Sequence, residues 1–228
     1  MKTRKTILAL AVMAALAVPS AASAQGLAFN YLEANYVNVD LDLSESFTDE
    51  EGTFSLETDN GDGFHIGGAW EVWENLHLFG EYSQASQDLV LTVTIGGETE
   101  SVKDDFDVIR YRVGLGYAYP VSSEMNLYGR VSYDYLEFDF DIDSVDDSGV
   151  GAEVGLVWAA MPQFHVQPYV RYTSVGEVDT SEDSSDSFDS DVLVGVGARY
   201  FLTENFALQG GYEYGEIRTW SLGLRYAF

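Results

Sequence analysis

The sequence ends in a run, Trp220 to Phe228, in which every second residue is large and apolar. The residues between them are small or polar and include Arg225. A period of two predicts a β-strand with one apolar face and one polar face. The apolar face could pack on the core of a soluble sheet or face lipid in an outer-membrane barrel, and the rest of the chain has to decide between them.

The same alternation recurs in four longer segments, residues 64–83, 109–135, 149–174 and 191–214, each holding two runs joined by a short turn. With the opening run at residues 27–41 and the closing strand, the chain predicts ten strands. Four short turns lie at one end of these strands. Four long acidic connections and one tight one lie at the other. This asymmetry is typical of transmembrane barrels, with the short turns on the periplasmic side. Pro168 falls inside the seventh strand, where we expect a bulge.

The two faces of the predicted strands differ sharply in charge. The face that continues Trp220 and Leu222 carries no charged residue, whereas the opposite face alternates glycines with arginines and carboxylates. A soluble sandwich would not bury such a face, so the pattern predicts lipid outside and a charged lumen inside. The lumen set is Glu33, Glu71, Glu81, Arg110, Arg112, Arg130, Asp134, Glu153, Arg171, Arg199, Glu213 and Arg225.

This charged set has two interpretations. It could select ions or solutes in an open pore, or it could form an internal salt-bridge network that fills a narrow barrel. Barrels of about eight strands are just wide enough for side chains to fill, and ten strands add little width. Buried charges also need partners. We therefore predict a filled lumen.

Apolar residues keep the inward parity beyond the predicted membrane span, while acidic residues point outward. This inversion predicts that several strands continue past the bilayer, with residues 95–98, "IGGE", as a hairpin turn. The apolar inward residues could form a packed cap, which we favour, or a cup for an apolar ligand. They are Leu89, Leu91, Val93, Phe106, Val108, Leu136, Phe138 and Phe140.

Composition narrows the class of protein further. Residues 1–24 combine a basic start, a short apolar run and a closing "ASA", which predicts a secretory signal peptide cleaved after Ala24. Residues 25–228 then form one barrel domain with 38 acidic and 8 basic residues, a net charge of −30. Such acidity excludes nucleic acid as a partner. The absence of cysteine excludes disulfides and thiolate chemistry, and 15 Tyr and 13 Phe argue against disorder.

The signal peptide, the first strand "YLEANYVNVD", the strand–turn–strand units and the terminal "LGLRYAF" resemble the small outer-membrane β-barrel proteins of Gram-negative bacteria. The resemblance covers the whole mature chain and is strongest to the ten-stranded members of xanthomonad-type bacteria. Many relatives have eight strands, which is the alternative fold. The resemblance implies recognition by the barrel assembly machinery through a terminal signal, here Leu222, Leu224, Tyr226 and Phe228.

Few residues suggest catalysis or metal binding. His65, His77 and His165 fall on different strands without a metal-ligand spacing. Outer-membrane hydrolases place a histidine at the outer rim, and His65 is the single candidate here, with no motif residue fixed beside it. The acidic connections could hold divalent cations diffusely, although "DNGDG" at residues 59–63 lacks the ligand pattern of a calcium loop. We expect no cofactor, no defined metal site and no enzymatic activity.

These patterns favour a monomeric outer-membrane barrel with a structural, adhesive or vesicle-associated role at the cell surface. Its expected partners are outer-membrane lipid, lipopolysaccharide and the assembly machinery. One alternative is a narrow porin or transporter for small or apolar solutes. A second is an outer-membrane hydrolase. The pattern specifies the fold much better than the activity.

Overall fold

The computed structural model describes residues 27, 29–41, 44–48, 52–96, 98–140, 144–178 and 188–228. The predicted signal peptide, residues 1–24, lies outside this described part. Within the described residues, no helix is long and apolar enough to cross a membrane. The described elements are twelve β-strands.

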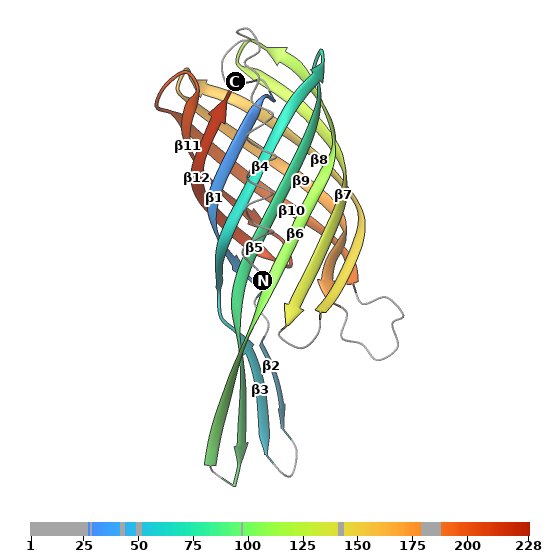
Figure 1. Cartoon of the computed structure of the whole chain (residues 1–228), viewed down its shortest axis with the longest axis vertical. Coiled ribbons are helices and arrows are strands. Elements are labelled where there is room, and N and C mark those ends of the chain that lie inside the picture. Colours follow the sequence, from blue (N-terminus) through green and yellow to red (C-terminus); the bar gives the residue numbers. More distant parts are fainter. Residues whose placement is uncertain are drawn as a thin grey trace, which may run out of the picture.

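Ten of the strands close into one antiparallel barrel (Figure 1). They are β1 (Tyr31–Asp40), β4 (Gly61–Trp73), β5 (Leu76–Ile95), β6 (Glu98–Ser122), β7 (Met125–Phe140), β8 (Ser144–Met161), β9 (Phe164–Val178), β10 (Phe188–Phe201), β11 (Phe206–Tyr214) and β12 (Arg218–Ala227). Sequential neighbours pair throughout, and β1 closes the ring against β12, from Tyr31 opposite Ala227 to Asp40 opposite Arg218. The prediction of an up-and-down ten-stranded barrel is confirmed, and the eight-stranded alternative is wrong.

Short turns join the strands at one rim, which lies at the top of Figure 1. In the turn between β4 and β5, Asn75 has a φ of 65°. Asparagine tolerates this left-handed conformation better than most residues. We call this end the short-turn rim and the opposite end the long-loop rim.

Pro168 does not produce the expected bulge. The β8–β9 pairs on either side, Gly155 with Tyr169 and Trp158 with Val166, are three residues apart in both strands, so the register passes through unshifted. The irregularity lies nearer the turn, between Ala159 and Met161. The intervening pairs are missing from this ladder, because a proline has no N–H to donate. The strand therefore loses local pairing toward β8 and keeps its register with β10, where Pro168 pairs with Val196.

Beyond the long-loop rim, a second sheet projects from the barrel (Figure 1). Strands β2 (Ser44–Thr48) and β3 (Thr53–Thr58) form a hairpin that pairs with the far end of β5, which in turn pairs with the start of β6. We call this four-stranded sheet the arm: β2, β3, residues 89–95 of β5 and residues 98–105 of β6. The predicted hairpin at residues 95–98 is present, with Gly96 at a φ of 62°. Gly97 lies outside the described residues. The β2–β3 hairpin was not predicted.

The wall of the barrel alternates between lumen and exterior. In β7, Tyr128, Arg130 and Asp134 are buried, whereas the intervening Val131 and Tyr133 are 61% and 46% exposed. The apolar exterior of the last strand follows the same rule, with Leu222, Leu224 and Tyr226 exposed. This uncharged outer surface is what a lipid-facing barrel requires.

Two apolar clusters occupy the ends of the lumen. At the short-turn rim lies the plug, formed by Leu27, Phe29, Tyr31, Ala69, Phe79, Ala118, Tyr128 and Val157. At the long-loop rim lies the cap, formed by Val37, Val39, Leu41, Ala85, Phe106, Val108, Leu136, Phe138, Val175 and Ile217. The charged residues lie between the two clusters. The interior is therefore layered along the barrel axis: apolar, charged, apolar.

Candidate functional site

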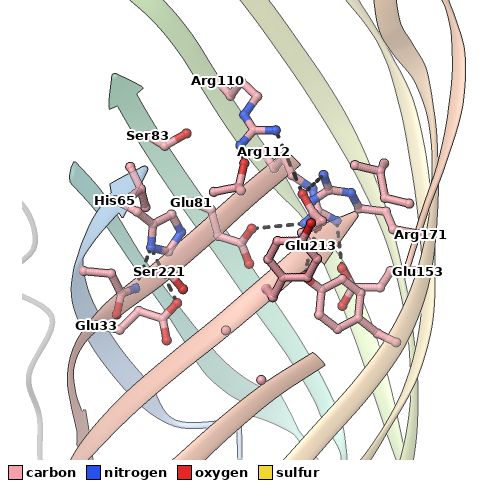
Figure 2. A pocket seen from close by; sticks show the side chains of 18 of the residues that line it. Glu33, His65, Glu81, Ser83, Arg110, Arg112, Glu153, Arg171, Glu213 and Ser221 are labelled. Atoms are coloured by element: carbon pink, nitrogen blue, oxygen red, sulfur yellow. Dashed lines mark hydrogen bonds and ion pairs between the residues drawn. The ribbon is translucent and has the colours of Figure 1, made fainter. Parts of the chain in front are cut away.

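The charged layer is built by side chains that point inward from almost every strand. Ten of the twelve predicted residues meet in ion pairs, and they fall into three groups. Figure 2 shows the cavity into which they turn. We call the whole set the ionic layer.

The largest group centres on Arg112 of β6 and Arg130 of β7. The Arg112 guanidinium lies 3.1 Å from Glu81 Oε2, 3.4 Å from Asp134 Oδ1 and 3.2 Å from Glu153 Oε2. Arg130 Nη1 contacts the other oxygens of Glu81 and Glu153, at 3.5 and 3.6 Å. Two arginines and three carboxylates therefore share these contacts, and each carboxylate has a guanidinium within 3.6 Å.

Arg130 also joins the ionic layer to the plug. Its Nε donates to His77 Nε2 at 3.2 Å and its Nη2 to the Tyr31 hydroxyl at 3.1 Å. Its guanidinium lies 4.6 Å from the ring centre of Phe79. His77 stacks on Phe29, with ring centres 4.1 Å apart. Cation–π and hydrogen-bond contacts thus hold a buried charge directly against apolar rings.

The second group lies beside the first (Figure 2). Glu213 of β11 receives Arg171 Nη2 at 2.8 Å and the Tyr169 hydroxyl at 2.9 Å, and Arg110 Nη1 lies 3.9 Å away. Arg110 also donates to Thr219 Oγ1 at 3.1 Å. One carboxylate here serves two arginines and a tyrosine.

The third group ties the two ends of the chain together across the closing pair of strands. Arg225 of β12 donates from Nε to Glu33 Oε2 at 3.0 Å and to Gln209 Oε1 at 2.9 Å. Its guanidinium lies 3.7 Å from the ring centre of Tyr31. His65 lies near the same carboxylate, with Nδ1 3.8 Å from Glu33 Oε1 and 2.9 Å from Asn35 Nδ2.

Two predicted members take other positions. Arg199 donates a hydrogen bond to the amide oxygen of Gln167, and the amide nitrogen of Gln167 donates to the Tyr128 hydroxyl at 2.8 Å. Glu71 lies near the short-turn rim, where it accepts from the backbone N–H of Asn75 at 3.1 Å. Among the ion pairs of the described residues, neither of the two takes part.

Neutral side chains complete the ionic layer, and the sequence pattern did not single them out. They are Tyr31, Tyr169, Gln167, Gln209 and His77. Each lies on a strand at the inward parity, which was the one available signal. Because the predicted set was chosen by charge, these hydrogen-bonding partners were missed.

A cavity of about 230 Å³ is lined by the ionic layer and by cap residues, among them Val37, Leu136, Val175 and Ile217. Its wall includes Gly197 of β10, Gly211 of β11 and Ser221 of β12, which project little or nothing into the lumen. Figure 2 shows long side chains of the first two groups turned toward this cavity. The small residues leave room in the lumen, although Arg199, Glu213 and Arg225 project from the same three strands.

The residues predicted for an apolar cup divide between two places. Phe106, Val108, Leu136 and Phe138 are buried in the cap, with Leu89 and Phe140 packed against it. Leu91 and Val93 are outside that cluster, and Leu91 is 40% exposed. They lie on the arm, beyond the reach of the barrel wall, because β5 continues past the long-loop rim.

The histidines and acidic residues show no metal cluster in the described ranges. The hydrogen-bond and ion-pair partners of His65 are the Asn35 amide and the Glu33 carboxylate, while Ser83 stands opposite His65 in the β4–β5 register without a described hydrogen bond between the two side chains. The predicted assembly signal lies on the exterior of β12. Phe228 follows the strand, and its backbone N–H donates to the Asn30 carbonyl at 3.1 Å.

A closed ten-stranded barrel with an uncharged outer belt and a charged lumen defines the class of outer-membrane barrels. The family model described as "Outer membrane protein beta-barrel domain" matches residues 8–228, and the chain belongs to this family. The family places the protein in the outer membrane. The narrower resemblance to xanthomonad-type members stays a prediction.

Solved structures similar to this chain include the outer membrane protein OprG from Pseudomonas aeruginosa, at 12% identity and a TM-score of 0.43, covering 87% of this chain and 94% of that one. The attachment invasion locus protein Ail of Yersinia pestis is 16% identical with a TM-score of 0.39, covering 88% and 100%. KdgM porin is 10% identical with a TM-score of 0.44, covering 86% and 99%. Among curated protein sequences, none matches the chain significantly.

Proposed function

We propose that this protein is a closed, non-conducting barrel that presents its arm and acidic connections at the cell surface, in a structural, adhesive or vesicle-associated role. The observation that carries the proposal is the layered lumen. An ion crossing the barrel would have to pass the plug, the ionic layer and the cap in series. Apolar constrictions exclude ions, because they offer nothing to replace the hydration shell.

The orientation follows from the asymmetry of the two rims. In the family of outer-membrane barrels, short turns face the periplasm and long loops face outward. The long-loop rim of this chain carries the arm and most of the 38 acidic residues. Placed outside, these carboxylates would repel lipopolysaccharide phosphates unless divalent cations bridged the two, which is the cation role we propose for them.

We propose no catalytic activity. His65 is engaged with Asn35 and Glu33 within the lumen wall, and among the described contacts no hydroxyl group is hydrogen-bonded to its ring, as activation of a nucleophile would require. The cavity between the glycine-bearing wall and the arginines supports one second candidate, a narrow passage for a small solute. That candidate requires the plug and the cap to part.

Planar-bilayer recording separates the two candidates. The purified, folded protein should show little or no steady conductance, and a large open porin reconstituted in the same way serves as the positive control. A stable, well-defined open channel in the unmodified protein would sink the proposal and favour the narrow porin.

A further inference from the structure

The arm is an amphipathic sheet with both faces outside the barrel. Directly opposed residues of antiparallel strands have side chains on the same face, so the register assigns each residue to one side. One row runs from Phe47 through Phe54 and Val93 to Glu100, and the next runs through Leu56 and Leu91 to Val102. This apolar face continues the lumen-facing side of the barrel wall, because Leu89 on the same face packs against the cap.

The opposite face is covered with hydroxyl groups. Its rows are Thr48, Thr53, Thr94 and Thr99, followed by Ser46, Ser55, Thr92 and Ser101. Hydroxyls of neighbouring strands lie 3.0–3.2 Å apart in three places. Most of the apolar residues therefore lie on one face and the hydroxyl groups on the other, and Val90 is the apolar exception on the hydroxyl face.

No described element covers the apolar face. Apart from a few isolated contacts, β2 contacts only β3 among the described strands, and β3 contacts only β2 and β5. Phe47 is 64% exposed, Ile95 53% and Val102 65%. A contiguous apolar face of this kind on a surface projection is typical of an interaction site.

The charges around this face indicate the chemistry of its partner. Residues 98, 100 and 104 of β6 lie on the apolar face by register, so a row of carboxylates, Glu98, Glu100 and Asp104, borders it along the outer strand. All three are exposed. The mature chain as a whole carries a net charge of −30.

These charges disfavour the other occupants. A second copy would bring the same carboxylate row, and lipopolysaccharide brings phosphates. Residues 179–187 of this chain, "DTSEDSSDS", contain no apolar residue that could cover the face. A polypeptide that is apolar on one side and basic along its edge is complementary to an apolar face bordered by carboxylates.

We propose that the apolar face of the arm binds a cationic amphipathic polypeptide segment in a helical conformation. Four strands about 4.8 Å apart give a face about 14 Å wide, which accommodates a helix of about 10–12 Å diameter. From Leu89 to Ile95 the face extends about 20 Å, the length of roughly four helical turns. The apolar stripe of the helix would lie over Leu91 and Val93, with its lysines or arginines along Glu98 and Glu100. This proposal rests on the surface role proposed above, because the arm must be outside to meet such a segment.

The binding test uses the full-length protein in nanodiscs of zwitterionic lipid. The probe is a fluorescein-labelled peptide of leucine and lysine, about 18 residues long, patterned as an amphipathic helix. Fluorescence anisotropy should show saturable binding above that of empty nanodiscs. It should weaken when the salt is raised from about 0.05 to about 0.3 M, since exposed charges are screened. A peptide with glutamate in place of lysine should not bind.

Matched variants locate the binding on one face. Glu100→Gln and Val102→Ser should each raise the Kd about fivefold or more, a change within the range of single interface contacts. Glu57→Gln and Val90→Ser make the same chemical changes on the hydroxyl face, where register places both residues, and should leave the Kd within about twofold. All four positions lie on the arm, so the barrel itself should stay folded and heat-modifiable.

Three results of the binding assay would overturn the proposal. They are equal losses on the two faces, no saturable binding above empty nanodiscs, and equal binding of the acidic peptide. A dimer in sedimentation that Val102→Ser abolishes and Val90→Ser does not would also overturn it and assign the face to a second copy. Conductance reports on the lumen and not on the arm, so failure of the closed-barrel proposal is recognised separately.

Discussion

At the scale of single residues, glycines determine which large side chains the lumen can hold. A Cβ at Gly155 would lie 2.5 Å from the Tyr128 hydroxyl and 2.6–2.7 Å from its ring carbons, closer than real contacts allow. Tyr128 is among the largest fully buried side chains of the protein. The missing side chain on β8 thus makes room for a ring from β7.

Gly155→Ala should therefore destabilise the barrel, because the Tyr128 ring would have to leave its position. Overpacking of this kind costs about 1–3 kcal/mol. Gly129→Ala is the control, since its Cβ would meet nothing closer than the Glu153 carbonyl at 3.8 Å, and its effect should stay within about 0.5 kcal/mol. Equilibrium unfolding in urea gives both values. Equal effects at the two glycines would contradict the assigned packing.

Arg130 is the residue whose loss should matter most within the ionic layer. It is 6% exposed and contacts Glu81, Glu153, His77 and Tyr31. Arg130→Ala leaves those carboxylates without one of their partners and should cost about 3–5 kcal/mol if the site is fully desolvated. Arg218→Ala, which breaks a half-exposed pair with Asp40, should cost less than about 1 kcal/mol. Similar losses of unfolding free energy in the two variants would argue against a dry ionic layer.

The alternation of the sequence predicts which residues of the ionic layer face the lumen, but not which of them contact one another. A period of two places Arg112 and Glu153 on the inner face, but their contact joins β6 to β8 across 41 residues. Such contacts depend on the circumference and stagger of the closed ring, which local alternation does not contain. The same gap explains why Glu71 and Arg199 were grouped with ion pairs that they do not join.

At the scale of elements, the ten barrel strands could be predicted and the β2–β3 hairpin could not. The barrel strands alternate over long stretches bounded by short turns. β2 has five residues and β3 has six, and both lie in an acidic stretch that resembles a loop. Phe54 and Leu56 alternate with polar neighbours, but two residues are too few to decide a period. Pairing with the overlong β5 stabilises the hairpin, and that contact is tertiary.

The arm and the short turns should lie on opposite sides of the membrane. Because the chain contains no cysteine, a thiol reagent can label only the single cysteine introduced in each variant of this protein. Ser101→Cys, on the exposed arm, should react with an impermeant thiol reagent on whole cells, and Ser123→Cys, in a short turn, should react only after the cells are opened. Labelling of Ser123→Cys alone on intact cells would invert the orientation.

The last strand should be needed for efficient assembly. Leu222, Leu224 and Tyr226 face outward on β12, and the Phe228 N–H bonds to the Asn30 carbonyl at the junction with β1. Deleting Phe228 removes both the terminal aromatic and this bond, so we expect periplasmic aggregates or degradation. Mutating Phe228 to tyrosine keeps the aromatic ring and should assemble nearly normally. Normal outer-membrane levels of the deletion variant would remove this role.

At the scale of the whole molecule, the plug and the cap act in series. Phe29→Ala shortens a side chain of the plug and Leu136→Ala shortens one of the cap, and each leaves the other cluster intact. Neither variant alone should therefore produce a large conductance. The double variant should leak more than the sum of the two single variants in planar bilayers, because water could then reach the ionic layer from both ends. Large leaks from a single variant would show that one layer does all the sealing.

The pairing of β1 with β12 also sets the order in which the molecule can form. Tyr31 meets Ala227, so the contact that turns a curved sheet into a ring joins residues almost two hundred positions apart. Such long-range contacts make the contact order high and folding slow, since the loop-closure entropy is lost before the contact is made. In a growing chain one edge of β1 can pair with β4, but its other edge has no partner until β12 has been delivered. The unfolded, aggregation-prone polypeptide must therefore be kept soluble in the periplasm until its export is complete. A product truncated before Arg218 lacks β12 and cannot close a smaller ring.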